Sequence, residues 1–276
     1  MMTLDLAPSL SPRPEAVAAL ELLDSLLDGF RFASPVDRSV ALSAMMTAVL
    51  RPKMTTSPLH AITCRGSHWA GKSTLVDLCA ALATGKDRCP SMTRGGGEAE
   101  LGRRVRSVIT DGDPIFAFHH SGTFRSRSFR TVLEEPRSWY PRQGGRSGQL
   151  VVNKTAFFVE GTALKLCEDL ARCAVVCTLE PWPSFEEGTL ARPAFDFHPI
   201  DRVLKDRDAY QNAVREMSRG FGFVGEEPFR CAPLSLFETW NTLVRSPLVW
   251  LGRPDPAASM TAAREKPRTR ILEAAQ

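Results

Sequence analysis

One octapeptide in the first third of the chain constrains its fold more than any other segment. Residues 66–73 read Gly-Ser-His-Trp-Ala-Gly-Lys-Ser and fit the spacing G-x-x-x-x-G-K-[ST] of a phosphate-binding loop, or P-loop. Gly66 and Gly71 allow a tight turn that brings backbone N–H groups close to phosphate oxygens. Lys72 reaches the outer phosphates as a positive charge, and the Ser73 hydroxyl can hold Mg²⁺. The motif therefore predicts a nucleoside triphosphate site.

The residues on either side of the loop agree with this prediction. A P-loop leaves a buried strand and opens a helix, and residues 59–64 form a short, mostly apolar run. Apolar residues then recur at helical spacing from Leu75 to Leu82, and Gly85 stands where a left-handed cap is expected. The predicted nucleotide-contacting residues are Gly66, Ser67, His68, Trp69, Ala70, Gly71, Lys72, Ser73 and Thr74.

Composition excludes several classes of protein. Of 276 residues, 43% are hydrophobic, which is enough for a sizeable core, and the net charge of +4 neither demands nor forbids nucleic acid. No run of about 18 apolar residues is present, so we expect no transmembrane helix. The seven cysteines form no Cys-x-x-Cys pair. They are typical of buried thiols in a reducing compartment, and we expect a cytoplasmic protein.

Strand-like and helix-like segments alternate along the chain. Residues 114–118, 149–152, 156–159 and 174–179 are predicted strands, which favours a three-layer α/β fold with a mostly parallel sheet. Helices are predicted to follow Pro14 and Ser34, and again at about 200–219 and 234–251. We expect a helical lead at 1–53, a nucleotide-binding core at 54–182, a C-terminal helical region at 183–253 and a tail at 254–276.

Several segments together resemble a known family. They are residues 37–44, 80–85, 237–245 and 248–256. From about Pro14 to Ala263 the chain resembles the AAA+-like ATPase portion of phage and prophage primase/helicase proteins. The resemblance implies a ring-forming homo-oligomer that binds ATP and Mg²⁺, tracks on DNA and works with replication proteins. It also implies expression in the cytoplasm of a bacterial host.

The chain departs from this family at three positions. An apolar strand ending in a metal-holding acid is expected after the P-loop helix, but the strand at 115–118 is followed by His119 and His120. Neutral imidazole is a poor ligand for Mg²⁺, which prefers oxygen. The expected sensor asparagine after the strand at 156–159 is missing, although Thr162 is a weak substitute. Of the expected arginine pair that acts on a neighbouring subunit's nucleotide, only Arg172 remains.

Two sets of site residues keep alternative interpretations. Glu160 ends an apolar strand and is a candidate replacement for the missing acid, as Mg²⁺ partner or water-polarising base; the alternative is a solvated carboxylate. His119 and His120 are either proton-transfer or substrate groups, or replacements of an acid that was lost. The candidate catalytic residues are therefore Lys72, Glu160 and Arg172, with Ser73 at the metal.

The segment 124–146 interleaves basic and aromatic residues. Arginine on phosphate and aromatic rings on bases are typical of single-stranded DNA binding. The alternative is a charged surface. The residues concerned are Arg125, Arg127, Arg130, Arg137, Arg142 and Arg146 together with Phe124, Phe129, Trp139 and Tyr140.

Three functional hypotheses follow. The first is an ATP-binding, phage-type DNA helicase or replication ATPase whose hydrolysis is weak unless Glu160 compensates for the missing acid. The second is a nucleotide-binding remnant or regulatory subunit without turnover. The third is a small-molecule kinase, against which the helical lead and the tryptophan-bearing C-terminal helix argue.

Overall fold

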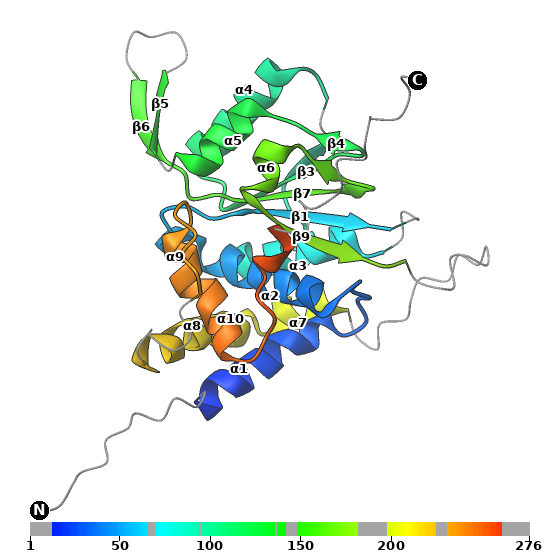
Figure 1. Ribbon diagram of the computed structural model, residues 1–276, viewed down its shortest axis with the longest axis vertical. Coiled ribbons are helices and arrows are strands. Elements are labelled where there is room, and N and C mark those ends of the chain that lie inside the picture. Colours follow the sequence, from blue (N-terminus) through cyan, green and yellow to red (C-terminus); the bar gives the residue numbers. More distant parts are fainter. Residues whose placement is uncertain are drawn as a thin grey trace, which may run out of the picture.

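A five-stranded, fully parallel sheet forms the centre of the protein (Figure 1). In this computed structural model the described residues are 13–65, 70–93, 95–135, 137–141, 148–181, 198–224 and 231–260. The strand order is β2-β3-β7-β1-β9. The strands are β2 (Ser91–Thr93), β3 (Ile115–His119), β7 (Ala156–Thr162), β1 (Leu59–Cys64) and β9 (Ala174–Leu179).

Helices cover both faces of this sheet, which explains why its strands are almost continuously apolar. Figure 1 shows α4 (Glu98–Asp111), α5 (Arg127–Glu134) and α6 (Glu168–Ala171) on one side of the sheet. On the other side lie α2 (Pro35–Leu50) and α3 (Lys72–Thr84). The predicted three-layer α/β fold with a mostly parallel sheet is confirmed.

Two glycines set the ends of α3. Gly71 precedes the helix with φ 81°, and Gly85 follows it with φ 75°, both in the left-handed region that favours glycine. Arg207 closes the last turn, because its guanidinium donates to the carbonyl oxygens of Leu82 and Ala83 at 3.1 and 2.7 Å. The first residues of the P-loop, 66–69, lie outside the described part of the chain.

The helical lead is part of the core rather than an appendage. After α1 (Pro14–Asp24), Ser34 caps α2 by accepting a hydrogen bond from the Asp37 backbone N–H at 3.3 Å. Helix α2 is buried on most of its surface, as expected of a helix enclosed on all sides. It contacts α3, β9 and α8 (Arg207–Val224).

The C-terminal helices differ from their predicted bounds. The helix expected at 200–219 is two helices, α7 (Pro199–Lys205) and α8, with a break at Asp206. The helix expected at 234–251 begins only at Glu238: α9 (Glu238–Trp240) runs into a π-helical turn at 241–245 and then α10 (Ser246–Trp250).

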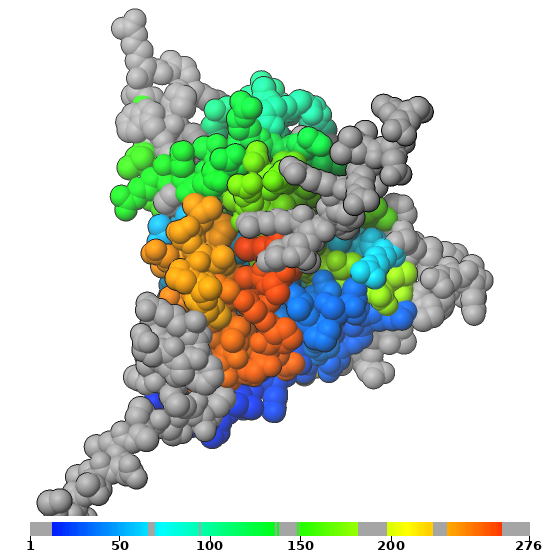
Figure 2. Space-filling model, in the orientation of Figure 1, coloured from blue at the N-terminus to red at the C-terminus, as the bar shows by residue number. Residues whose placement is uncertain are grey.

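Proline explains the π-helical turn. Pro247 has no N–H to donate to the carbonyl of Leu243, and the Ser218 hydroxyl of α8 donates to that carbonyl instead. The turn leads to residues 253–260, which pack back on the start of the chain. Figure 2 shows this orange-red surface against the blue surface of the N-terminal helices, where Ser39 Oγ donates to the Pro254 carbonyl at 2.6 Å.

Two short pairings stand apart from the main sheet. Strands β4 (Thr123–Phe124) and β8 (Lys165–Leu166) form a parallel pair. Strands β5 (Arg137–Pro141) and β6 (Gly148–Val152) form an antiparallel hairpin that projects from the body of the molecule (Figure 1). The strand predicted at 149–152 is therefore real, but it belongs to this hairpin and not to the parallel sheet.

Candidate functional site

A cavity of about 420 Å³ opens at the carboxyl edge of the sheet. Strands β3 and β7 end there and α3 begins there, which is where open α/β sheets bind ligands. The lining residues are Lys72, Ser73, Thr93, His119, His120, Ser121, Glu160, Gly161 and Thr162. The structure thus brings together Lys72, Ser73, Glu160 and both histidines that the sequence singled out.

Lys72 lies in the first turn of α3 with only 8% of its surface exposed. Its Nζ lies 3.2 Å from Cys64 Sγ at the end of β1, and Cys64 Sγ in turn lies 3.7 Å from Thr162 Oγ1. The N-terminus of α3 presents the positive end of the helix dipole to the cavity beside this ammonium group. Lysine and helix together make the cavity electrostatically suited to an anion.

Glu160 is the central residue of the site. Its side chain is 3% exposed, so it is not the solvated strand-end carboxylate that was the alternative. Oε2 accepts a hydrogen bond from Ser73 Oγ at 2.9 Å, and Oε1 lies 2.9 Å from His119 Nδ1. A buried carboxylate needs such partners, because leaving water is costly for an unpaired charge.

His119 is held between two strands. Its Nδ1 faces Glu160 on β7, and its Nε2 lies 2.9 Å from Ser91 Oγ on β2. The hydrogen bond to Glu160 raises the pKa of His119, while partial burial opposes the rise. The imidazole therefore holds its proton more readily than a free histidine does, and the protonated form neutralises Glu160.

Gly161 fixes the distance between the ends of β3 and β7. A Cβ at this position would lie 1.7 Å from the backbone oxygen of His120, so only glycine fits. The His120 N–H also donates to the Glu160 carbonyl at 2.9 Å. The His120 ring packs edge-on against Phe124 at 5.5 Å between centroids, so its role is partly structural.

The remaining predicted catalytic residue, Arg172, lies elsewhere. It follows α6 and precedes β9, at the amino end of that strand and away from the cavity at the carboxyl edge. Its side chain is 58% exposed and pairs with Glu168 at 3.3 Å. Arg172 therefore cannot reach the phosphate site of its own chain.

Only some residues of the arginine-rich segment lie at the surface. Phe124 and Phe129 are fully buried and pack with Phe118 and Phe157, so the expectation that they stack on bases is wrong. Their apolar size fits the core under α5 better than a solvent face. The exposed arginines that remain are Arg125, Arg127 and Arg137. Residues 142–147 and the side chains of Trp139 and Tyr140 lie outside what the structure describes.

Sequence reasoning missed the contacts that join these residues. Ser91, Gly161 and the pairing of Glu160 with His119 were not predicted, although Glu160 and the histidines were considered separately. A signal was present, because parallel strands share one carboxyl edge and the last residues of two neighbouring strands must lie together. In the observed register His119 stands directly beside Glu160.

The oxygen donors in the cavity suit a hard divalent cation. Mg²⁺ takes carboxylate and hydroxyl oxygens, and Glu160 and Ser73 already place such oxygens 2.9 Å apart beside Lys72. Within the described ranges, no group of three or more histidine, cysteine, aspartate or glutamate side chains is arranged to hold a metal ion.

Comparison with known proteins gives only distant likenesses. No family model and no curated protein matches the chain. Among solved structures, the apo C-terminal region of NrS-1 is similar at 15% identity and a TM-score of 0.39, over 74% of this chain and 45% of that one. The JCV helicase bound to a thiazolopyridine compound is similar at 12% identity and a TM-score of 0.35, over 91% and 70%. The chain thus spans under half the length of the NrS-1 region.

Hydropathy adds one separate finding. Among the described residues, none of the helices combines the length and the apolar composition that spanning a bilayer requires.

Proposed function

We propose that this chain binds ATP with Mg²⁺ and acts as a phage-type helicase or replication ATPase. The observation that carries the proposal is the contact between Ser73 at the start of α3 and the buried Glu160 on β7. It places a carboxylate beside the predicted metal ligand of the P-loop, although the position expected to hold an acid carries His119.

Each residue of the cavity then has a stated task. Lys72 neutralises charge on the outer phosphates, and the N–H groups at the start of α3 hold phosphate oxygens. Ser73 and Glu160 offer oxygens to Mg²⁺, which when bound supplies positive charge to the phosphates. Glu160 also orients and polarises the attacking water. His119, paired with Glu160 and anchored by Ser91, keeps that carboxylate in one orientation.

Arg172 supports assembly into a homo-oligomer. It is exposed and lies away from the phosphate cavity of its own chain, so in this proposal it stabilises charge on the nucleotide of a neighbouring subunit. A ring would pair the Arg172 edge of one subunit with the Lys72 edge of the next. Replication proteins are the expected partners of such a ring.

Single-stranded DNA is the proposed polymer on which the ring moves. Exposed Arg125 and Arg127 at the start of α5, and Arg137 on the β5–β6 hairpin, supply phosphate contacts. On β6, the Leu150 side chain is 59% exposed and that of Val152 is 41% exposed, an unusual apolar edge on a projecting hairpin. In this proposal that edge packs against bases while the arginines hold the backbone.

Steady-state ATP hydrolysis tests the proposal. We expect turnover that rises with single-stranded DNA, is abolished by Lys72→Ala and falls by a factor of about 100 or more in Glu160→Gln, because one electrostatic contact in such a site is worth a few kcal/mol. The exposed Glu135→Gln is the matched control and should leave turnover unchanged. Turnover that needs Lys72 but is unaffected by Glu160→Gln would remove Glu160 from the mechanism.

A nucleotide-binding regulator without turnover is the second candidate. The observation that favours it is the contact of His119 Nδ1 with Glu160 Oε1 at 2.9 Å, which occupies one of the two carboxylate oxygens. This candidate predicts tight ATP binding with no phosphate release in the wild type. Because the contact with His119 is what occupies Glu160 in this candidate, His119→Asn should leave ATP binding intact and start hydrolysis. A variant that binds ATP without hydrolysing it would show that His119 is not what prevents turnover.

A further inference from the structure

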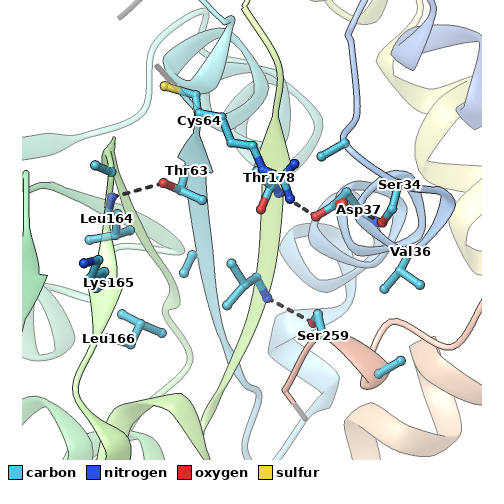
Figure 3. Close-up of a pocket in the computed structure, with 16 residues that line it drawn as sticks. Ser34, Val36, Asp37, Thr63, Cys64, Leu164, Lys165, Leu166, Thr178 and Ser259 are labelled. Carbon is cyan, nitrogen blue, oxygen red and sulfur yellow. Dashed lines mark hydrogen bonds between the residues drawn. The ribbon is translucent and has the colours of Figure 1, made fainter. Parts of the chain in front are cut away.

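A second, larger cavity of about 790 Å³ lies over the face of β1 and β9. Figure 3 shows Thr63 of β1 and Thr178 of β9 on its floor, with Leu164, Lys165 and Leu166 along one wall. Residues 33–37 and 258–259 close the opposite wall. The connection between β7 and β9 carries the two-residue strand β8 and the four-residue helix α6, so it contains no long helix to cover this part of the sheet face.

The two cavities meet at the end of β1. Cys64 lines the larger cavity, and its Sγ lies 3.2 Å from Lys72 Nζ, which lines the smaller one. Thr162 lines the smaller cavity, and the next residue, Ala163, lines the larger. A molecule whose phosphates bind at Lys72 therefore has the smaller cavity for its phosphates and the adjoining larger cavity for its apolar body.

The walls of the larger cavity are apolar or already hydrogen-bonded. Thr63 Oγ1 accepts from the Leu164 N–H at 3.1 Å, as Figure 3 shows. Asp37 Oδ1 accepts from the Thr178 N–H at 2.6 Å, and Ser34 Oγ donates to Asp37 Oδ2 at 2.6 Å. These bonds fix the orientation of Thr63 and Asp37 toward the protein, and the donor that Thr63 keeps is its own O–H group.

Two cations remain at the rim. Arg65 and Lys165 are exposed, and no carboxylate among the described residues forms an ion pair with either. Arg65 directly precedes the phosphate loop. A planar guanidinium stacks on any aromatic ring and also attracts phosphate, so it suits a nucleotide without selecting its base.

We infer that the larger cavity receives the nucleoside half of the bound nucleotide and holds the base by stacking and apolar contact, with little discrimination among bases. The inference rests on the proposed function, since the phosphates must sit at Lys72. Strong base selection needs buried polar groups that go unpaired when the wrong base binds. This cavity has the volume for a nucleoside, but its buried polar groups are bonded to the protein itself.

Calorimetric titration with ATP, GTP, CTP and tripolyphosphate tests the inference. We expect the three nucleotides to bind within about fivefold of one another, less than the factor that one lost hydrogen bond produces. Ala258→Trp places an indole in the cavity from an exposed wall position and should weaken all three nucleotides about tenfold or more. It should leave tripolyphosphate unchanged. Ala99→Trp, on the exposed face of α4, is the matched control.

The outcomes separate this inference from the proposal beneath it. Tripolyphosphate binding that is lost in Lys72→Ala, together with nucleotide affinities unaffected by Ala258→Trp, overturns only the nucleoside cavity. A preference of about a hundredfold for one base over another also overturns it, because that needs specific hydrogen bonds. Failure of the wild type to bind tripolyphosphate overturns both. Circular dichroism checks folding, and the smaller Ala258→Leu replaces the tryptophan variant if that variant unfolds.

Discussion

Gly161→Ala is the sharpest perturbation of this protein, because one added methyl group meets backbone rather than a side chain. Its Cβ would lie 1.7 Å from the His120 carbonyl oxygen, whereas Cβ atoms essentially never approach other atoms closer than 3.0 Å. One strand end must move by more than an ångström. That movement breaks the 2.9 Å hydrogen bond from the His120 N–H to the Glu160 carbonyl.

The cost can be worked out from the packing. Inserting a methyl group into a well-packed interior costs about 1–3 kcal/mol, and here neither partner has a rotamer with which to yield. We therefore expect a loss of about 3 kcal/mol, which lowers the melting temperature of a domain of this size by roughly 6–12 °C. Because Glu160 and His119 sit on the strands that move, ATP affinity should fall as well.

Thermal melting with and without ATP measures both effects. Gly95→Ala is the matched control, since a Cβ at the exposed Gly95 meets nothing within 4 Å and its backbone is not left-handed. We expect that variant to stay within about 0.5 kcal/mol of the wild type. If Gly161→Ala melts and binds ATP like Gly95→Ala, the account of how β3 and β7 position Glu160 is wrong.

Three further predictions concern charge. The raised pKa of His119 contributes stability that is complete below its ordinary value of 6.5 and is lost as pH rises through the raised value. The melting-temperature gap between wild type and His119→Gln should therefore shrink from about pH 5.5 toward pH 9, and a constant gap would contradict this. Arg51→Met removes donors to the carbonyls of Thr155, Asn153 and Met54 at 2.9, 2.8 and 3.1 Å, so urea unfolding should show a loss of about 3 kcal/mol or more. A loss below about 1 kcal/mol would show that water replaces the guanidinium. Replacing Arg125, Arg127 and Arg137 by alanine should lower the salt dependence of single-stranded DNA binding by about 0.7 in slope per lost contact, measured by fluorescence anisotropy, and an unchanged slope would exclude them as phosphate contacts.

The elements that sequence predicts well are those whose signal is local. The cap at Gly85, the helix that follows Ser34 and the apolar strand at 174–179 appear as expected, because each depends on a few neighbouring residues. The helix at 234–251 was predicted too long at its start. Its internal π-helical turn depends on Pro247 and on Ser218 of another helix, a contact invisible to local patterns.

The candidate site likewise combines residues that a local motif predicts with contacts that depend on the arrangement of distant strands. Lys72 and Ser73 follow from a motif, but the partners of Glu160 depend on strand order. Only with β7 between β1 and β3 can one carboxylate reach both Ser73 and His119. The stacking role predicted for Phe124 and Phe129 was wrong for a related reason, because composition does not reveal which residues of a segment face the core. Phe124 and Phe129 are buried while Arg125 and Arg127 between them are exposed.

The hydrogen bonds along the outer edge of β9 determine which truncations of this chain leave the sheet intact. Backbone N–H groups of Thr178 and Val176 donate to Asp37 at 2.6 Å and to Ser259 at 3.0 Å, so residues from both ends of the described chain occupy that edge. A fragment beginning at residue 54, the boundary that the sequence suggested, would lack Asp37 and leave the Thr178 N–H on this strand unmatched and open to neighbouring molecules. Aggregation of such a fragment in expression trials would then result from the exposed edge of β9, and not from an unstable nucleotide-binding core.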